Sequence, residues 1–252
     1  VPDPGYGGGA PPEDAGQLDG RRFRAGRLTR LHIGSHTATR AALAGLSGSV
    51  AGPGAGLVAG IDRYQRPVPV PWFRPEPTRI SLVGDVGTGQ LLAFRALALG
   101  TRVVVVTHQP DLWNGFGART VGAADRVAVF GSERPFAVTA TGQRPALVIY
   151  DLGVTGATNP PPLGPWQTQL TILRRLDPAG VPAVQGCHLV MLQRLTEPEA
   201  ATAARALRLP GQQVELIQAM TDDMLALLGG GVDRYVWLAR TELEEQYASA
   251  RQ

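Results

Sequence analysis

The chain has 252 residues, a net charge of +3 and one cysteine, Cys187. All 24 of its basic residues are arginines, which excludes a P-loop lysine and lysine Schiff-base chemistry. One cysteine excludes an intramolecular disulfide and a zinc cluster, and the modest charge makes a nucleic-acid partner unexpected. No apolar run reaches the roughly 20 residues that a membrane span needs.

The amino-terminal segment is rich in proline, glycine and acidic residues. Residues 1–20 offer too little apolar surface to offset the entropy of ordering, so we expect a flexible tail or linker. The arginine cluster that follows contains Arg21, Arg22 and Arg24, which are candidate contacts for an acidic partner or for anionic head groups. A solvated, arginine-rich edge strand is an equally good interpretation.

The next part of the chain predicts alternating strands and helices. We expect a strand at 28–34, a short helix at 36–48, a proline-spaced extended segment at 66–73, strands at 79–84, 101–108 and 124–130, a helix at 88–100 and a short helix at 109–122. The β-branched run at 101–108 is typical of a strand buried on both faces.

The second half continues the alternation. We expect strands at 144–153 and 186–194, helices at 166–177 and 196–209, a hairpin around Gly229–Gly231 and a polar end that frays. Thr196 and Glu199 have the spacing of a capping box.

This alternation predicts an α/β fold, with a mostly parallel, Rossmann-like sheet flanked by helices and a C-terminal hairpin. We expect one domain over 21–245. Two halves, 21–145 and 146–245, are the alternative, and they can share one continuous sheet.

The turn after the predicted strand at 79–84 has the glycine spacing of a P-loop. Gly84 and Gly89 match G-x-x-x-x-G, but Gln90 and Leu91 stand where a P-loop has Lys and Ser/Thr. Asp151, after the apolar run LVIY, is a conceivable Walker-B-like acid without a neighbouring carboxylate to activate water. The residues that hold phosphate and Mg²⁺ are therefore missing from their expected positions.

A dinucleotide fingerprint beginning at Gly87 would need a glycine at position 92, which is Leu92. Gly84, Gly87 and Gly89 are candidate cofactor-binding residues only if bare helix amides bind an anion. We favour the alternative that these glycines let the helix pack closely on the strand.

The remaining candidate residues do not match a catalytic or metal-binding motif. His32 and His36 lack the glutamate of H-E-x-x-H, so we expect no metal site, and Cys187 is expected to be a small core residue. Trp113 and Trp166 lie near proline-containing loops and are candidate partner contacts. Packing of these loops onto the sheet is an equal alternative.

Several runs of the sequence resemble the EccE component of the type VII (ESX) secretion systems of actinobacteria. They are LVGDVGTGQLLAFRALALGTRVVVVTHQPDLW, GPWQT, LVMLQRLTEPEA and RYVWL, within residues 27–240. The similarity lies in the whole run, since no single residue is a chemical signature.

This resemblance implies a soluble domain at the cytoplasmic face of the cell membrane, beside EccB, EccC and EccD, with EccC supplying the ATPase activity. It implies no catalytic residues and no cofactor, so we expect a non-catalytic structural subunit that acts through protein–protein contacts. EccE proteins are anchored by N-terminal membrane helices, so we expect this chain to be truncated before Val1. The alternative is an enzyme that binds a nucleotide or nucleotide-sugar on a Rossmann-like fold.

Overall fold

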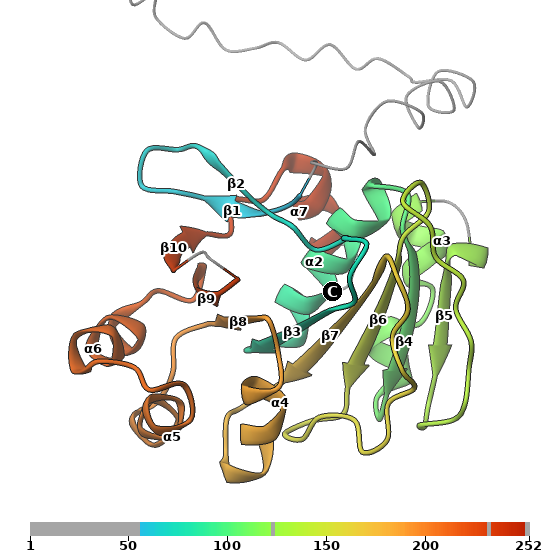
Figure 1. The fold of residues 1–252 in the computed structure, drawn as a ribbon. Helices are drawn as coiled ribbons and strands as arrows, with labels where there is room; N and C mark the ends of the chain where they lie inside the picture. The colour runs from blue at the N-terminus through green and yellow to red at the C-terminus, as the bar shows by residue number, and fades with distance from the viewer. Residues whose placement is uncertain (1–55, 122–123, 231–232, 250–252) are drawn as a thin grey trace, which may run out of the picture. The chain divides into compact units, whose positions relative to one another are not determined.

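The computed structural model describes residues 56–121, 124–230 and 233–249, all within one compact unit (Figure 1). The predicted tail at 1–20, the arginine cluster and the elements expected at 28–34 and 36–48 lie outside the described residues.

The described strands form one sheet of ten (Figure 1). In their spatial order they are β2 (Pro67–Val70), β1 (Leu57–Ile61), β10 (Arg234–Trp237), β9 (Met224–Gly229), β8 (Leu189–Leu192), β3 (Thr78–Val83), β7 (Gln167–Leu173), β6 (Ala146–Asp151), β4 (Arg102–Thr107) and β5 (Val127–Phe130). The strands from β8 to β5 run parallel, and the other four extend the sheet antiparallel. The mostly parallel α/β fold predicted from the sequence is confirmed, including its C-terminal hairpin of β9 and β10.

The two halves of the sequence are interleaved in this sheet. β3 belongs to the first half, yet it lies between β7 and β8 of the second half. Ile80 pairs with Leu170 on one side and with Leu189 on the other. The halves therefore share a single sheet.

Helices cover both faces of the sheet (Figure 1). They are α2 (Val86–Ala98), α3 (Phe116–Val121), α4 (Val181–Gln185), α5 (Glu197–Leu207), α6 (Gly211–Ala219) and α7 (Glu242–Ser249), with short 3-10 helices at Pro110–Trp113, Ala124–Arg126 and Pro178–Gly180. The buried side chains of α2 and α3 join the apolar core on one face, and α7 contacts α2. Those of α4, α5 and α6 join a separate core on the opposite face.

The segment at 166–177, expected to be a helix, is strand β7 followed by a turn. Its side chains alternate, because Leu170 and Ile172 join the α2-side core while Gln169 and Thr171 face the other way. A central strand between β3 and β6 satisfies its backbone on both sides, and this pairing overrides the helix-like spacing of its leucines.

One prediction about helix ends was confirmed, and another was wrong. The capping box at the start of α5 is confirmed, with Thr196 and Glu199 satisfying each other's backbone. The polar end expected to fray instead forms α7, because Glu244 is buried against Arg95 of α2.

Candidate functional site at the carboxyl edge of the sheet

Neighbouring strands β3 and β7 send the chain to opposite faces of the sheet. β3 leads into α2 on one face, and β7 leads to α4 on the other. Such a divergence leaves a crevice at the carboxyl ends of the strands, where open α/β sheets bind ligands. A cavity of about 590 Å³ lies there, lined by residues that follow β3, β7 and β8.

The turn after β3 is shorter than a P-loop. β3 ends at Val83 and α2 begins at Val86, so Gly84 and Asp85 alone connect them. The carboxylate of Asp85 accepts hydrogen bonds from the backbone N–H and the hydroxyl of Thr88, both at 2.9 Å. A side-chain carboxylate of the chain itself thus caps the helix end that would hold phosphate in a P-loop.

The environment of Asp85 favours its charged form. Burial raises the pKa of this carboxyl, but hydrogen bonds from Thr88 and the contact with Gln193 outweigh burial and leave the pKa below its ordinary value. A negative charge therefore stays at the N-terminus of α2, and it opposes the approach of a second anion there.

The predicted glycines serve close packing. A Cβ on Gly84 would lie 2.0 Å from Oε1 of Gln193, which accepts a hydrogen bond from the backbone N–H of Asp85 at 2.6 Å. A Cβ on Gly89 would lie 2.3 Å from Cδ1 of Ile172, where α2 crosses β7. Of the two approaches, that of Gly89 lies between α2 and the sheet and matches the packing interpretation of the turn.

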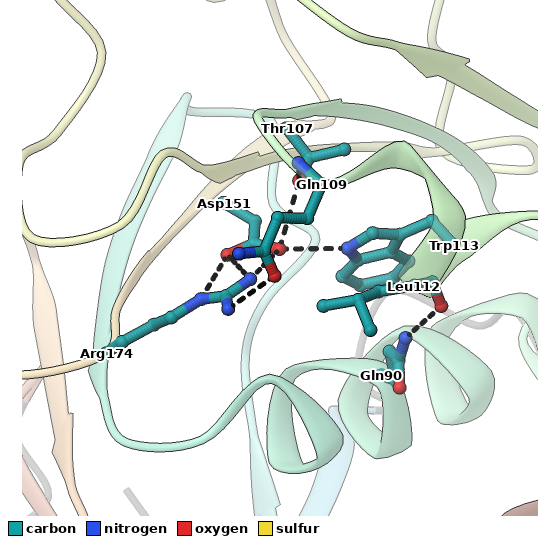
Figure 2. Close-up of polar contacts among 7 residues, drawn as sticks. All are labelled: Gln90, Thr107, Gln109, Leu112, Trp113, Asp151 and Arg174. Atoms are coloured by element: carbon teal, nitrogen blue, oxygen red, sulfur yellow. Dashed lines mark hydrogen bonds and ion pairs between the residues drawn. The ribbon is translucent and has the colours of Figure 1, made fainter.

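The two residues at the P-loop Lys and Ser/Thr positions point into the protein. Gln90 is 1% exposed, and its Nε2 donates to the backbone oxygen of Leu112 at 2.7 Å (Figure 2). Leu91 belongs to the α2-side core. Neither side chain contributes to the cavity.

Asp151, at the end of β6, is the centre of a buried polar network (Figure 2). Its carboxylate accepts from the hydroxyl of Thr107 at 3.1 Å and from the indole N–H of Trp113 at 3.0 Å. The guanidinium of Arg174 donates to both carboxylate oxygens, at 3.0 to 3.2 Å, and also to Oε1 of Gln109 at 2.8 Å. The side chain of Asp151 is fully buried, whereas that of Arg174 is 30% exposed and lines the cavity.

The proposed partner contact at Trp113 needs correction. Its side chain is 0% exposed, because the indole stacks at a tilt against Phe116 and hydrogen-bonds Asp151. Trp166 is half-buried beside Gly142, with its backbone in the left-handed region. Trp113 therefore packs its loop onto the sheet, whereas the partner contact at Trp166 stays a prediction.

The rim of the cavity carries charges of both signs. Arg194 pairs with Asp222 at 2.9 Å, and both side chains are exposed. Glu199 accepts from the backbone N–H groups of Thr196 and Leu176. The cavity therefore presents two arginines to a ligand, each held by a carboxylate.

The described residues contain no group of three or more His, Cys, Asp or Glu side chains that could hold a metal ion. His32 and His36 lie outside these residues. His188 accepts a hydrogen bond at Nδ1 from the backbone N–H of Arg79 at 3.0 Å. Cys187 is half-buried against the α4-side core, and burial raises the pKa of its thiol.

Comparison with known proteins gives similarity in structure alone. No protein-family model and no curated protein match the sequence. VirB4 of Thermoanaerobacter pseudethanolicus matches with a TM-score of 0.55 and 9% identity, over 78% of this chain and 99% of that chain. The genome packaging NTPase B204 from Sulfolobus turreted icosahedral virus 2, in complex with ATP-gammaS, matches with a TM-score of 0.44 and 8% identity, over 64% and 96%. The chain shares its fold with VirB4.

The match to VirB4 contradicts the resemblance to EccE. It also contradicts the expectations that rested on this resemblance, namely a non-catalytic structural subunit and a chain that is not an enzyme. The quoted runs include β3, β4 and β8, whose apolar residues suit any buried parallel sheet. The sequence similarity is explained by the fold, and the family inferred from it was wrong.

The partners EccB, EccC and EccD and a place at the cytoplasmic face of the membrane were predicted from the same resemblance and are untested. Among the described helices, none combines the length and the apolar character that a membrane crossing requires.

Arg174 and its network were missed from the sequence. The available signal was a charged residue directly after a β-branched apolar run in two places, Asp151 after LVIY and Arg174 after LTIL. Because 166–177 was interpreted as a helix, Arg174 was not placed at a strand end beside Asp151.

Proposed function

We propose that this domain binds a nucleotide at the carboxyl edge of its sheet, with the phosphates held by Arg174 and Arg194. The observation that carries the proposal is the cavity of about 590 Å³ between the segments that leave β3 and β7, with both guanidinium groups in its lining. Clefts of this size at such a divergence of the chain are the usual ligand sites of open α/β sheets.

Arginine is suited to this role in a chain without lysine. Its planar guanidinium donates two parallel hydrogen bonds to a phosphate as it does to a carboxylate. Arg174 is already oriented at the rim by Asp151 and Gln109, so it loses little side-chain entropy when a ligand binds.

Arg194 is free to exchange partners. Its side chain is 55% exposed and that of Asp222 is 84% exposed, and such surface ion pairs contribute at most about 1 kcal/mol. A phosphate with more than one negative charge therefore displaces Asp222 at small cost.

The test is a titration with ATP, GTP, NAD and a UDP-sugar, followed by calorimetry and by the thermal midpoint, with phosphate release measured on the same samples. We expect at least one nucleotide to raise the midpoint by several degrees. Arg194→Ala should weaken binding about tenfold, the loss of one charged hydrogen-bonded contact.

Arg175→Ala is the matched control, because Arg175 is exposed, lies 3.9 Å from Asp177 and is not part of the cavity lining. The proposal is wrong if no nucleotide binds at millimolar concentration, or if Arg175→Ala weakens binding as much as Arg194→Ala.

A further inference from the structure

The sheet face that carries α4, α5 and α6 is divided into two apolar clusters. One lies around β8 and β9, and the other around β4 and β6. Between them, β3 and β7 present Ser81, Gln169 and Thr171, all of them buried. On the opposite face of the same two strands, Ile80, Leu82, Leu170 and Ile172 join the apolar core. The polar residues of that face, Thr78 and Thr168, lie at the starts of the strands, and Thr168 donates to the backbone oxygen of Trp72.

A cavity of about 470 Å³ lies at these polar residues. β3 and β7 form one wall, and Ala183 of α4 and the loop at Gly156 contribute to the rest. Its volume is in the range of small-molecule sites. It shares none of its lining residues with the cavity at the carboxyl edge.

Gln169, one of the lining residues, has a buried side-chain oxygen without a hydrogen-bond partner among the described residues. The residue is 8% exposed, and the unpaired atom is its Oε1. Its Nε2 donates to the hydroxyl oxygen of Thr171 at 3.2 Å. Buried polar atoms are almost always paired, so an unpaired amide oxygen on a residue that lines a cavity indicates a missing partner.

The free groups define the chemistry of that partner. Oε1 of Gln169 accepts one hydrogen bond, and the hydroxyl proton of Thr171, next to it, is available to donate another. If the amide of Gln169 is rotated by 180°, Gln169 becomes the donor and Thr171 the acceptor. A ligand then still needs one donor beside one acceptor.

The charges of the lining residues further limit the class of ligand. Arg79 is the one arginine in the lining, which contains no carboxylate, so the cavity disfavours a cationic ligand.

We propose that this cavity binds a small planar molecule with an N–H beside a carbonyl, as in a primary carboxamide or a pyrimidine base. The side-chain amide of Gln169 turns toward the cavity on binding, so that the ligand N–H donates to its Oε1, and the ligand carbonyl accepts from the hydroxyl of Thr171. A glutamine amide recognises the edge of a base by supplying both a donor and an acceptor, whereas here Gln169 and Thr171 supply one each. The site is independent of the proposed nucleotide site.

The experiment uses nicotinamide and uracil as probes and N,N-dimethylnicotinamide, which has no N–H, as the matched negative probe. Binding is measured by calorimetry and by ligand-observed NMR. We expect nicotinamide or uracil to bind, and Gln169→Met to weaken that binding at least about tenfold by removing both amide groups at nearly constant volume.

Gln90→Met is the control variant, since Gln90 is also buried with an unpaired Oε1 but belongs to α2. It should leave probe binding unchanged, and Gln169→Met should not lower the thermal midpoint. Arg194→Ala should also leave probe binding unchanged, which separates this result from the nucleotide titration. The inference is overturned if neither probe binds at 10 mM (about the weak limit for a fragment), if the dimethyl amide binds equally well, or if both glutamine variants weaken binding alike.

Discussion

Two arginine–carboxylate pairs hold distant parts of this molecule together, and they differ in what surrounds the arginine. Arg95 and Glu244 are both nearly buried, at 12% and 6% exposure, and Arg95 also donates to the backbone oxygens of Val58, Ala59 and Ala239. Arg174 pairs with a fully buried Asp151 but remains 30% exposed at a cavity. The first pair is entirely structural, whereas the second combines a structural carboxylate with an arginine that a ligand can reach.

The largest expected effect comes from removing the buried carboxylate at the cavity. Asp151→Ala leaves Arg174, Trp113 and Thr107 without their shared acceptor, so the free energy of unfolding should fall by about 3–5 kcal/mol. Chemical denaturation measures this change. Asp177→Ala is the control, because Asp177 caps a short 3-10 helix at the surface and should cost about 1 kcal/mol. Equal losses in the two variants would contradict the central role of Asp151.

The Arg95–Glu244 pair should make stability depend on pH. Burial raises the pKa of Glu244, but hydrogen bonds from Arg95 and Thr241 outweigh it and leave the pKa below its ordinary value of 4.5. A depressed folded pKa contributes stability that is present above the unfolded pKa and is lost as the pH falls through the folded value. The free energy of unfolding should therefore decrease from about pH 5 downward.

Glu244→Gln isolates this contribution. It should lower the free energy of unfolding at neutral pH by about 2 kcal/mol and flatten the acid limb of the pH profile. Glu242→Gln, which changes an exposed residue of the same helix, should do neither. An acid limb that is as steep in Glu244→Gln as in the unaltered chain would show that other carboxylates dominate, Asp85 among them.

The smallest expected effect concerns the carboxylate beside the proposed phosphate position. Asp85→Asn keeps a good N-cap for α2 but removes the negative charge that opposes a phosphate. Nucleotide affinity should rise by about two- to fivefold, which corresponds to 0.4–1 kcal/mol of helix-terminus electrostatics. Calorimetric titration of Asp85→Asn beside Asp177→Asn measures it. A weaker complex with Asp85→Asn would mean that this carboxylate assists binding.

Local pattern was enough to predict the strands at 79–84 and 101–108, the helix at 88–100 and the capping box, because buried parallel strands and capped helices have strong local signatures. It failed for β7, whose identity depends on pairing with β3 and β6, both distant in the sequence. It failed for α7 for a similar reason, since the partner of Glu244 lies 149 positions away.

The candidate site was predicted in part. The position of the glycine turn at the end of β3 followed from the sequence. The cavity-lining arginines could not be predicted from the sequence. Arg174 is held in place by Asp151 and Gln109, which are distant from it in the sequence, so local pattern does not reveal the contact.

The interleaved order of the strands has a consequence for how the chain is made. β3 emerges early from the ribosome, but its neighbours β7 and β8 are encoded roughly 90 and 110 positions later, as the pairs of Ile80 with Leu170 and Leu189 show. Until residue 173 has been synthesised, both edges of this central strand lack their native partners, and the edge that pairs with β8 lacks its partner until residue 192. Folding dominated by such distant contacts is slow, and the centre of the sheet is completed only after most of the chain exists.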